Sequence, residues 1–219
     1  MKNKHPLFSF KYLAMDMARL VCAVLIPILR LKRYDIEGKP YKKSISGGAL
    51  IAANHSSFWD PFVVGVCFWK RRLHFLAAEV VMKGRFRSAL IGGVGGIKID
   101  RTKADIEAVN TSTEKLKEGF LLAIFPQGGI DRENDVDTVK SGAVLISLRS
   151  GAPIIPMYIA PKRGLFSRRR VVIGDEINPK EHCSKIMPST ADIGKISELL
   201  AKEMNSLKEA YKIFSEEKQ

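Results

Sequence analysis

His55 and Asp60 are the pair of side chains in this sequence with the clearest potential for acid–base chemistry. Four residues separate them, and both follow the apolar run 49–53. Across a turn between a strand and a helix, the carboxylate can fix the tautomer of the imidazole and stabilise the ring as it takes a proton. The spacing therefore predicts a general base. It also leaves a structural interpretation open, in which Ser57 or Asp60 caps a helix that begins near Pro61.

Two further groups of residues follow apolar runs, where a sheet would place ligand-binding side chains. Arg101 follows the run 97–99 and can hold a phosphate through a forked pair of hydrogen bonds. Gly128 and Gly129 follow the run 121–125, and glycines let backbone N–H groups approach an oxyanion or a phosphate closely. Each group also has a simpler interpretation, the first as a surface ion pair and the second as a turn.

The types, order and separations of these residues together resemble the glycerolipid acyltransferase family, which includes 1-acylglycerol-3-phosphate acyltransferase. The resemblance covers roughly residues 35–176. The first family motif, NHxSxxD, is matched by Asn54, His55, Ser57 and Asp60, and the second, GxIxIDR, by Gly96, Ile97, Ile99, Asp100 and Arg101. The third motif, FPEGTR, is matched only by Phe125, Pro126 and Gly128. The fourth, a PIVPV-like run, is matched by residues 153–157, which Lys140, Gly142 and Ala143 precede.

The resemblance implies an O-acyltransferase of phospholipid biosynthesis. A fatty acyl group would pass from a thioester of coenzyme A or acyl carrier protein to the free hydroxyl of a lysophospholipid, first of all 1-acylglycerol-3-phosphate, giving phosphatidic acid. His55 would deprotonate the hydroxyl and Asp60 would orient His55, with no covalent acyl-enzyme and with Ser57 as a local cap. Because the thioester is already activated, a positioned base and charge stabilisation suffice, and we expect no metal and no resident cofactor.

The third motif departs from the family pattern. Gln127, Gly129 and Ile130 stand where the family has Glu, Thr and Arg, and the family uses those positions to recognise the acceptor. The alternative acceptor is therefore a different lysolipid or lipid alcohol. The residues that we predict to bind substrate are Arg101, Lys83, Gln127, Gly128, Gly129 and Arg132.

Membrane contact is predicted at the N-terminus and in a basic loop. The apolar run 20–29 is about half of the roughly 20 residues that a spanning helix needs, and basic residues follow it. We expect an interfacial helical element on the cytoplasmic face of the membrane, peripheral or monotopic; a packed helix and a solvated charged face are the alternatives. The predicted contact residues are Arg30, Lys32, Arg33, Leu165, Phe166, Arg168, Arg169 and Arg170.

Composition supports an intracellular globular protein with an anionic partner. The 219 residues are 46% hydrophobic, and the three cysteines lie far apart, which excludes a disordered chain and a disulfide-stabilised miniprotein. The net charge of +13 attracts a polyanion. A non-catalytic basic module for membranes or nucleic acid is the competing class, and an inactive member of the family is a third hypothesis. We expect no nucleic-acid partner, because no known binding motif occurs and aromatic residues do not alternate with the basic ones.

Short apolar runs alternate with helical patterns after residue 40, which predicts an α/β fold with a mixed, largely parallel sheet flanked by helices. We expect a membrane-docking helical segment over residues 1–34, with Pro27 ending or kinking a helix, and one acyltransferase domain over residues 35–219. The expected strands are 49–53, 73–77, 97–99, 121–125, 153–159 and 170–173. The expected helices are 61–69, 86–91, 104–118, 138–149 and 191–214, the third with Thr102 and Asp105 in capping-box spacing.

Overall fold

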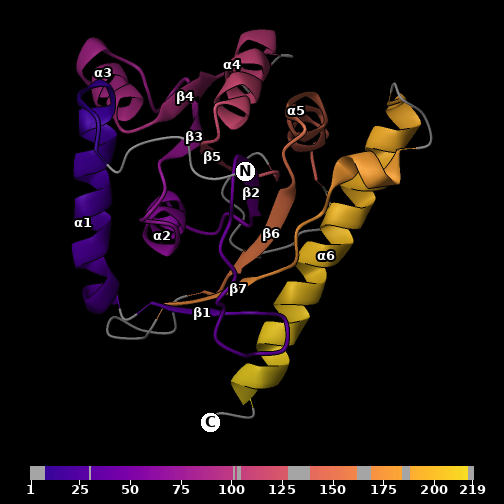
Figure 1. The fold of residues 1–219 in the computed structure, drawn as a ribbon. Coiled ribbons are helices and arrows are strands. Elements are labelled where there is room, and N and C mark those ends of the chain that lie inside the picture. The colour runs from indigo at the N-terminus through magenta and orange to yellow at the C-terminus, as the bar shows by residue number, and fades with distance from the viewer. Residues whose placement is uncertain are drawn as a thin grey trace.

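The computed structural model describes residues 8–29, 31–100, 102, 105–127, 139–161, 169–183 and 188–216. Within them, seven strands form one sheet in the order β1-β7-β6-β2-β5-β3-β4 (Figure 1). Neighbouring strands run parallel except β6 and β7, which are antiparallel. The strands are β1 (Lys32–Tyr34), β2 (Ala49–Ala53), β3 (Leu73–Ala78), β4 (Gly96–Ile99), β5 (Leu121–Ile124), β6 (Ile154–Ile159) and β7 (Arg170–Ile173).

The predicted α/β class with a mostly parallel sheet is confirmed. Each predicted strand is present, with ends that differ by at most one residue, and each predicted helix is present with ends that shift by a few residues. The helices are α1 (Leu13–Leu29), α2 (Asp60–Cys67), α3 (Arg85–Gly93), α4 (Ile106–Lys117), α5 (Gly142–Ser150) and α6 (Thr190–Glu216), with short 3-10 helices at η1 (Phe10–Tyr12) and η2 (Pro179–His182).

The centre of the sheet is buried on both faces, as the continuous apolar runs predicted. In β2 all residues are buried, and their side chains alternate between two cores. Leu50 and Ala52 join the core formed with α4, α5 and α6, whereas Ile51 and Ala53 join the core formed with α2. The end of β2 is therefore held rigidly between two packed layers, and this end carries the residues of the first motif.

Helix α1 forms an additional layer outside α2 (Figure 1). Its attachment includes a buried ion pair: both carboxylate oxygens of Asp16 accept hydrogen bonds of 2.8 Å from Arg72, and Arg19 also binds Asp16. The opposite face of α1 is apolar and exposed, with 42–65% of each residue accessible at Leu13, Met17, Leu20, Val21 and Val24. Within the described part of the chain, no helix combines the length and the hydropathy needed to cross a bilayer.

Three local expectations need correction. The segment 1–34 is not wholly helical, because β1 pairs with β7 and the sheet begins inside it. Pro27 does not itself end α1, which continues to Leu29, although its ring removes one hydrogen bond to the carbonyl four residues earlier. The N-cap of α4 is Asp105 itself, whose carboxylate accepts a hydrogen bond of 2.9 Å from the Ala108 N–H, so Thr102 does not begin a capping box.

Candidate active site

His55 and Asp60 contact each other in the turn between β2 and α2, as their spacing predicted. The Nδ1 of His55 lies 3.2 Å from the Oδ2 of Asp60. The same carboxylate oxygen accepts hydrogen bonds of 2.8 Å and 2.7 Å from the backbone N–H groups of Ser56 and Ser57. Asp60 therefore closes the turn and contacts the imidazole with one oxygen. Its side chain is fully buried, so water does not compete for this contact.

The turn after β5 supports His55 from the neighbouring strand. The ring of Phe125 stacks on the imidazole, with centroids 4.3 Å apart and an angle of 26° between the planes. The Oε1 of Gln127 accepts a hydrogen bond of 3.0 Å from the backbone N–H of His55. Together these contacts fix the ring plane and the backbone of a histidine that is only 9% exposed.

Asn54, which follows the last residue of β2, is hydrogen-bonded to β6, the strand on the other side of β2 from β5. Its Nδ2 donates to the carbonyl of Ile159 at 3.1 Å, and its Oδ1 accepts from the Ile159 N–H at 2.6 Å. The side chain thus continues the hydrogen bonding between β2 and β6 beyond the last residue of β2. The sequence indicated Asn54 only as part of a motif, because its partner is 105 residues away.

The ends of three adjacent parallel strands, β5, β2 and β6, therefore converge on one imidazole. A carboxylate on Nδ1 holds the neutral ring in the tautomer that leaves Nε2 able to accept a proton. It also stabilises the positive charge that proton uptake creates. The other carboxylate oxygen of Asp60, Oδ1, is buried and has no hydrogen-bond partner among the described residues. The hydrogen bonds to this carboxylate from described residues therefore all reach Oδ2, from His55 and from the N–H groups of Ser56 and Ser57.

Comparison with known proteins shows the family to which this arrangement belongs. The model of the family described as Acyltransferase matches residues 33–160, from β1 to the end of β6. The chain belongs to the acyltransferase family. It is an enzyme of the acyltransferase class.

Individual relatives extend over most of this acyltransferase. The 1-acyl-sn-glycerol-3-phosphate acyltransferase of Bacillus subtilis is 25% identical over 182 residues, covering 81% of this chain and 87% of the relative. The enzyme of the same name from Borreliella burgdorferi is 22% identical over 177 residues, covering 78% of this chain and 65% of the relative. The crystal structure of the 1-acyl-sn-glycerophosphate (LPA) acyltransferase PlsC from Thermotoga maritima has the same fold, with a TM-score of 0.58, 20% identity, and coverage of 91% of this chain and 80% of that one.

The structure describes two of the six residues predicted to bind substrate in this acyltransferase, Lys83 and Gln127. Gln127 contacts the first motif through its Oε1, as given above. Lys83 is exposed in the segment between β3 and α3. Arg101, Gly128, Gly129 and Arg132 lie outside the described residues.

The structure describes four of the eight predicted membrane-contact residues, and these lie at the sheet edge formed by β1 and β7. Lys32 and Arg33 belong to β1, and Arg170 belongs to β7, with Lys32 and Arg170 in register. The carbonyl of Arg169 accepts a hydrogen bond from the Lys32 N–H, and Arg33 donates to the carbonyl of Cys67 at 2.9 Å. The residues Arg30, Leu165, Phe166 and Arg168 lie outside the described part of the chain.

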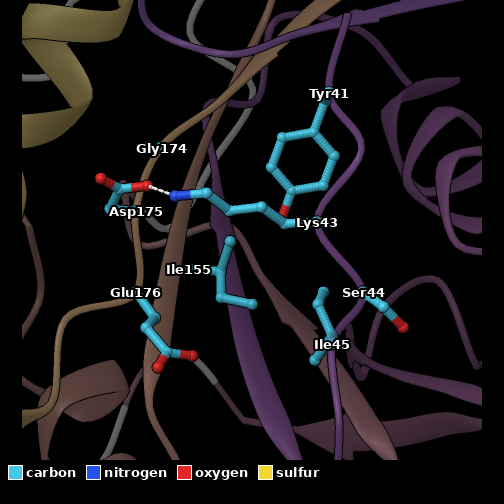
Figure 2. Close-up of a pocket in the computed structure, with 8 residues that line it drawn as sticks. All are labelled: Tyr41, Lys43, Ser44, Ile45, Ile155, Gly174, Asp175 and Glu176. Atoms are coloured by element: carbon cyan, nitrogen blue, oxygen red, sulfur yellow. Dashed lines mark hydrogen bonds and ion pairs between the residues drawn. The ribbon is translucent and has the colours of Figure 1, made fainter.

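A cavity of about 460 Å³ is lined by residues of β6, of the segment before β2 and of the segment after β7 (Figure 2). Its wall includes Ile155, which precedes Ile159 by four residues on β6, a distance of about 13 Å along a strand. Figure 2 shows the Tyr41 ring beside the Lys43 side chain, which forms an ion pair with Asp175. Burial raises the pKa of Tyr41. The cavity therefore lies at a different part of the sheet from the acid–base pair, and neither His55 nor Asp60 lines it.

Proposed function

We propose that this enzyme transfers a fatty acyl group from an acyl thioester to the free hydroxyl of a lysophospholipid. The donor is a thioester of coenzyme A or of acyl carrier protein, and the preferred acceptor is 1-acylglycerol-3-phosphate, which gives phosphatidic acid. The names of the relatives support this choice of acceptor. The observation that carries the chemistry is the 3.2 Å contact between Nδ1 of His55 and Oδ2 of Asp60, both of which are buried residues.

His55 is the general base in this proposal. Its Nδ1–H donates to Asp60, so its Nε2 takes the proton from the acceptor hydroxyl. The hydroxyl oxygen attacks the thioester carbonyl, forming the new C–O bond. When the tetrahedral intermediate collapses, the C–S bond breaks and the proton passes from Nε2 to the leaving thiolate. No residue is acylated, and Ser57 keeps a local role in which its hydroxyl accepts a hydrogen bond of 3.3 Å from the Trp59 N–H.

Substrates of this kind reside in a bilayer, and exposed apolar residues near the site fit that location. The apolar face of α1 is described above, and aromatic side chains at the start of α2 are also exposed, namely Phe58 at 62%, Trp59 at 60% and Phe62 at 48%. Large exposed apolar areas on one protein mark an interaction surface. We propose that the enzyme docks peripherally on the cytoplasmic face of the membrane, with α1 lying along the interface.

Acyl transfer by the purified protein tests this function. Wild type and His55→Ala are each incubated with labelled acyl-CoA or acyl carrier protein and a set of lysolipids that includes 1-acylglycerol-3-phosphate. We expect labelled phosphatidic acid with wild type and a rate about 100- to 10,000-fold lower with His55→Ala. Full activity of His55→Ala, or a labelled acyl-Ser57 after rapid quenching, would overturn the mechanism.

A second acceptor class is favoured by one specific feature. Gln127 and Ile130 replace the Glu and Arg of the family motif, which removes one negative and one positive charge from the acceptor region. If another lysolipid or a lipid alcohol is acylated faster than 1-acylglycerol-3-phosphate in the same assay, these replacements determine the specificity. If no acceptor is acylated while the protein still binds vesicles, the chain is a non-catalytic module.

A further inference from the structure

Helix α3 lacks the buried face that normally stabilises a helix of its length. None of residues 85–93, all of which the structure describes, is buried. Phe86 is 81% exposed and Leu90 is 57% exposed, and residues four apart lie on the same side of a helix. A helix of nine residues is too short to be stable in water through its own hydrogen bonds alone. Its apolar side therefore lacks a partner within the described residues.

The charges around α3 are arranged for contact with an anionic surface. Lys83, Arg85 and Arg87 are all exposed, and none of them forms an ion pair with a described residue. The first turn of the helix carries no acidic residue, although the N-terminal end of a helix is positively polarised and favours negative charge. The N-cap is Gly84, which has no side chain to cap the free N–H groups. These positive charges repel one another in water and are neutralised by a surface that carries phosphate groups.

The apolar side of α3 adjoins the exposed face of α1. Figure 1 shows α3 beside the N-terminal end of α1. A methyl group added to Gly93 of α3 would lie 3.5 Å from the Ala14 side chain of α1, so the two helices pack closely there. Phe10, in η1 directly before α1, is 96% exposed, and Val80, in the segment before α3, is 74% exposed. Apolar groups on two adjoining elements that are not covered by the protein indicate one extended surface.

We propose that α3 and the segment before it form a second membrane-docking element, specific for anionic phospholipid. Phe86 and Leu90 enter the interface between head groups and acyl chains, and Lys83, Arg85 and Arg87 bind lipid phosphates. The inference deepens the proposed function, because it names the surface that holds the enzyme on the bilayer containing its substrate. An acidic carrier protein would satisfy the charges, but it would not cover apolar groups that continue onto α1.

Vesicle binding tests the two halves of the surface separately. Sedimentation is measured with vesicles of phosphatidylglycerol and phosphatidylcholine for wild type, for Arg85→Gln/Arg87→Gln and for Phe86→Ser/Leu90→Ser. Each cation near an anionic surface contributes enough to change binding several-fold, so we expect the double charge variant to bind about 30-fold more weakly. The controls are Lys195→Gln/Lys202→Gln and Ile213→Ser on α6, which remove the same kinds of exposed group elsewhere. We expect them to bind like wild type.

Insertion is tested by tryptophan fluorescence in Phe86→Trp, with Ile213→Trp as the matched control and the wild-type signal subtracted. We expect vesicles with brominated acyl chains to quench the added tryptophan at position 86 and not the one at position 213. Vesicle binding unchanged by the charge variant, or no quenching at position 86 in the bound protein, would overturn the proposal. If the charge variant instead raises only the KM for acyl carrier protein, an acidic protein is the partner of this surface.

Acyl transfer to monomeric lysolipid, below its critical micelle concentration, separates this inference from the proposed function. The α3 variants should keep their rate in that assay, whereas His55→Ala should lose it and still bind vesicles. A rate lost in all variants would point to misfolding, which circular dichroism of each variant detects.

Discussion

The backbone N–H of His55 donates a 3.0 Å hydrogen bond to the side-chain oxygen of Gln127, 72 residues further along the chain. This contact joins the first and the third family motifs. It gives Gln127 a positioning role that does not require the negative charge of the glutamate found in the family, because a neutral amide oxygen accepts the same hydrogen bond. The departure from the family motif is therefore compatible with a correctly placed imidazole.

We expect Gln127→Leu to lower kcat by about 10- to 100-fold, because the His55 N–H loses its partner and the imidazole shifts. Gln127→Glu keeps an acceptor oxygen and should stay within about threefold of wild type. Steady-state kinetics and the melting temperature are measured for both variants. A positioning role requires that kcat differ between Gln127→Leu and Gln127→Glu while their melting temperatures are similar. Equal kcat values would mean that Gln127 does not position His55.

Asp60→Asn tests the orientation of the imidazole. The amide oxygen can still accept the hydrogen bonds from Ser56 and Ser57, so the turn should fold as before. The charge that stabilises protonated His55 is lost, and we expect kcat to fall by about 100- to 10,000-fold with little change in the KM for the acyl donor. Single-turnover kinetics separates this chemical step from product release. Activity within tenfold of wild type would contradict the proposed role of Asp60.

The attachment of α1 depends on a buried ion pair. Burial acts to raise the pKa of Asp16, but hydrogen bonds from Arg72, the Ser9 N–H and Arg19 outweigh this and lower the pKa. Because removal of one partner leaves a buried charge, we expect Asp16→Asn to reduce the free energy of unfolding by about 3–5 kcal/mol. Asp16→Leu/Arg72→Leu should recover much of this loss. Urea titrations measure both variants.

The exposed pair of Lys212 and Glu209 on α6 provides the control for the ion-pair experiment. Both side chains are accessible to water, so Glu209→Gln should change the free energy of unfolding by less than about 1 kcal/mol. A loss at Asp16 that is no larger than this would mean that the network around Arg72 does not hold α1 in place.

His74 makes the stability of the fold depend on pH. Burial lowers the pKa of His74 to about 4, and the nearby charge of Lys115 acts in the same direction. In the unfolded chain the imidazole has a pKa near 6.5 and binds a proton first as the pH falls. The folded state should therefore lose about 3 kcal/mol of stability between pH 6.5 and pH 4, with no further loss from this group at lower pH.

Urea unfolding of His74→Asn at pH 7.5 and pH 5 measures this effect. The asparagine amide can donate to the Gly95 carbonyl, which lies 3.1 Å from Nδ1 of His74, without taking up a proton. We expect the pH-dependent loss of stability to shrink in this variant and to persist in His182→Asn, where the residue is exposed in η2. An unchanged loss in His74→Asn would assign the pH dependence to other groups.

Much of the fold was predictable because the central strands can be identified from their own residues alone. The runs that form β2, β5 and β6 are apolar throughout, as expected for strands covered on both faces. The strand β1 was not predicted, because its sequence Lys-Arg-Tyr carries charges and its pairing is with residue 170 and beyond. Its identity as a strand depends on a distant partner, which no local pattern shows.

The same distinction applies to the candidate site. The contact between His55 and Asp60 follows from a spacing of five residues within one turn and was predicted. The contact between Gln127 and the His55 N–H depends on how the ends of β2 and β5 align, so the sequence indicated substrate binding for Gln127 and not this hydrogen bond. A helix over residues 86–91 was predicted from the sequence, but the lack of any buried residue in α3 is a tertiary property.

The hydrogen bonds between Asn54 and Ile159 also bear on the order in which the enzyme becomes functional during its synthesis. Residue 54 leaves the ribosome long before residue 159, and until β6 has emerged the amide of Asn54 has no strand to join. A nascent chain that ends before residue 159 contains the complete first motif but lacks the hydrogen bonds between Asn54 and β6. The candidate site can therefore be anchored to β6 only after residue 159 has been made.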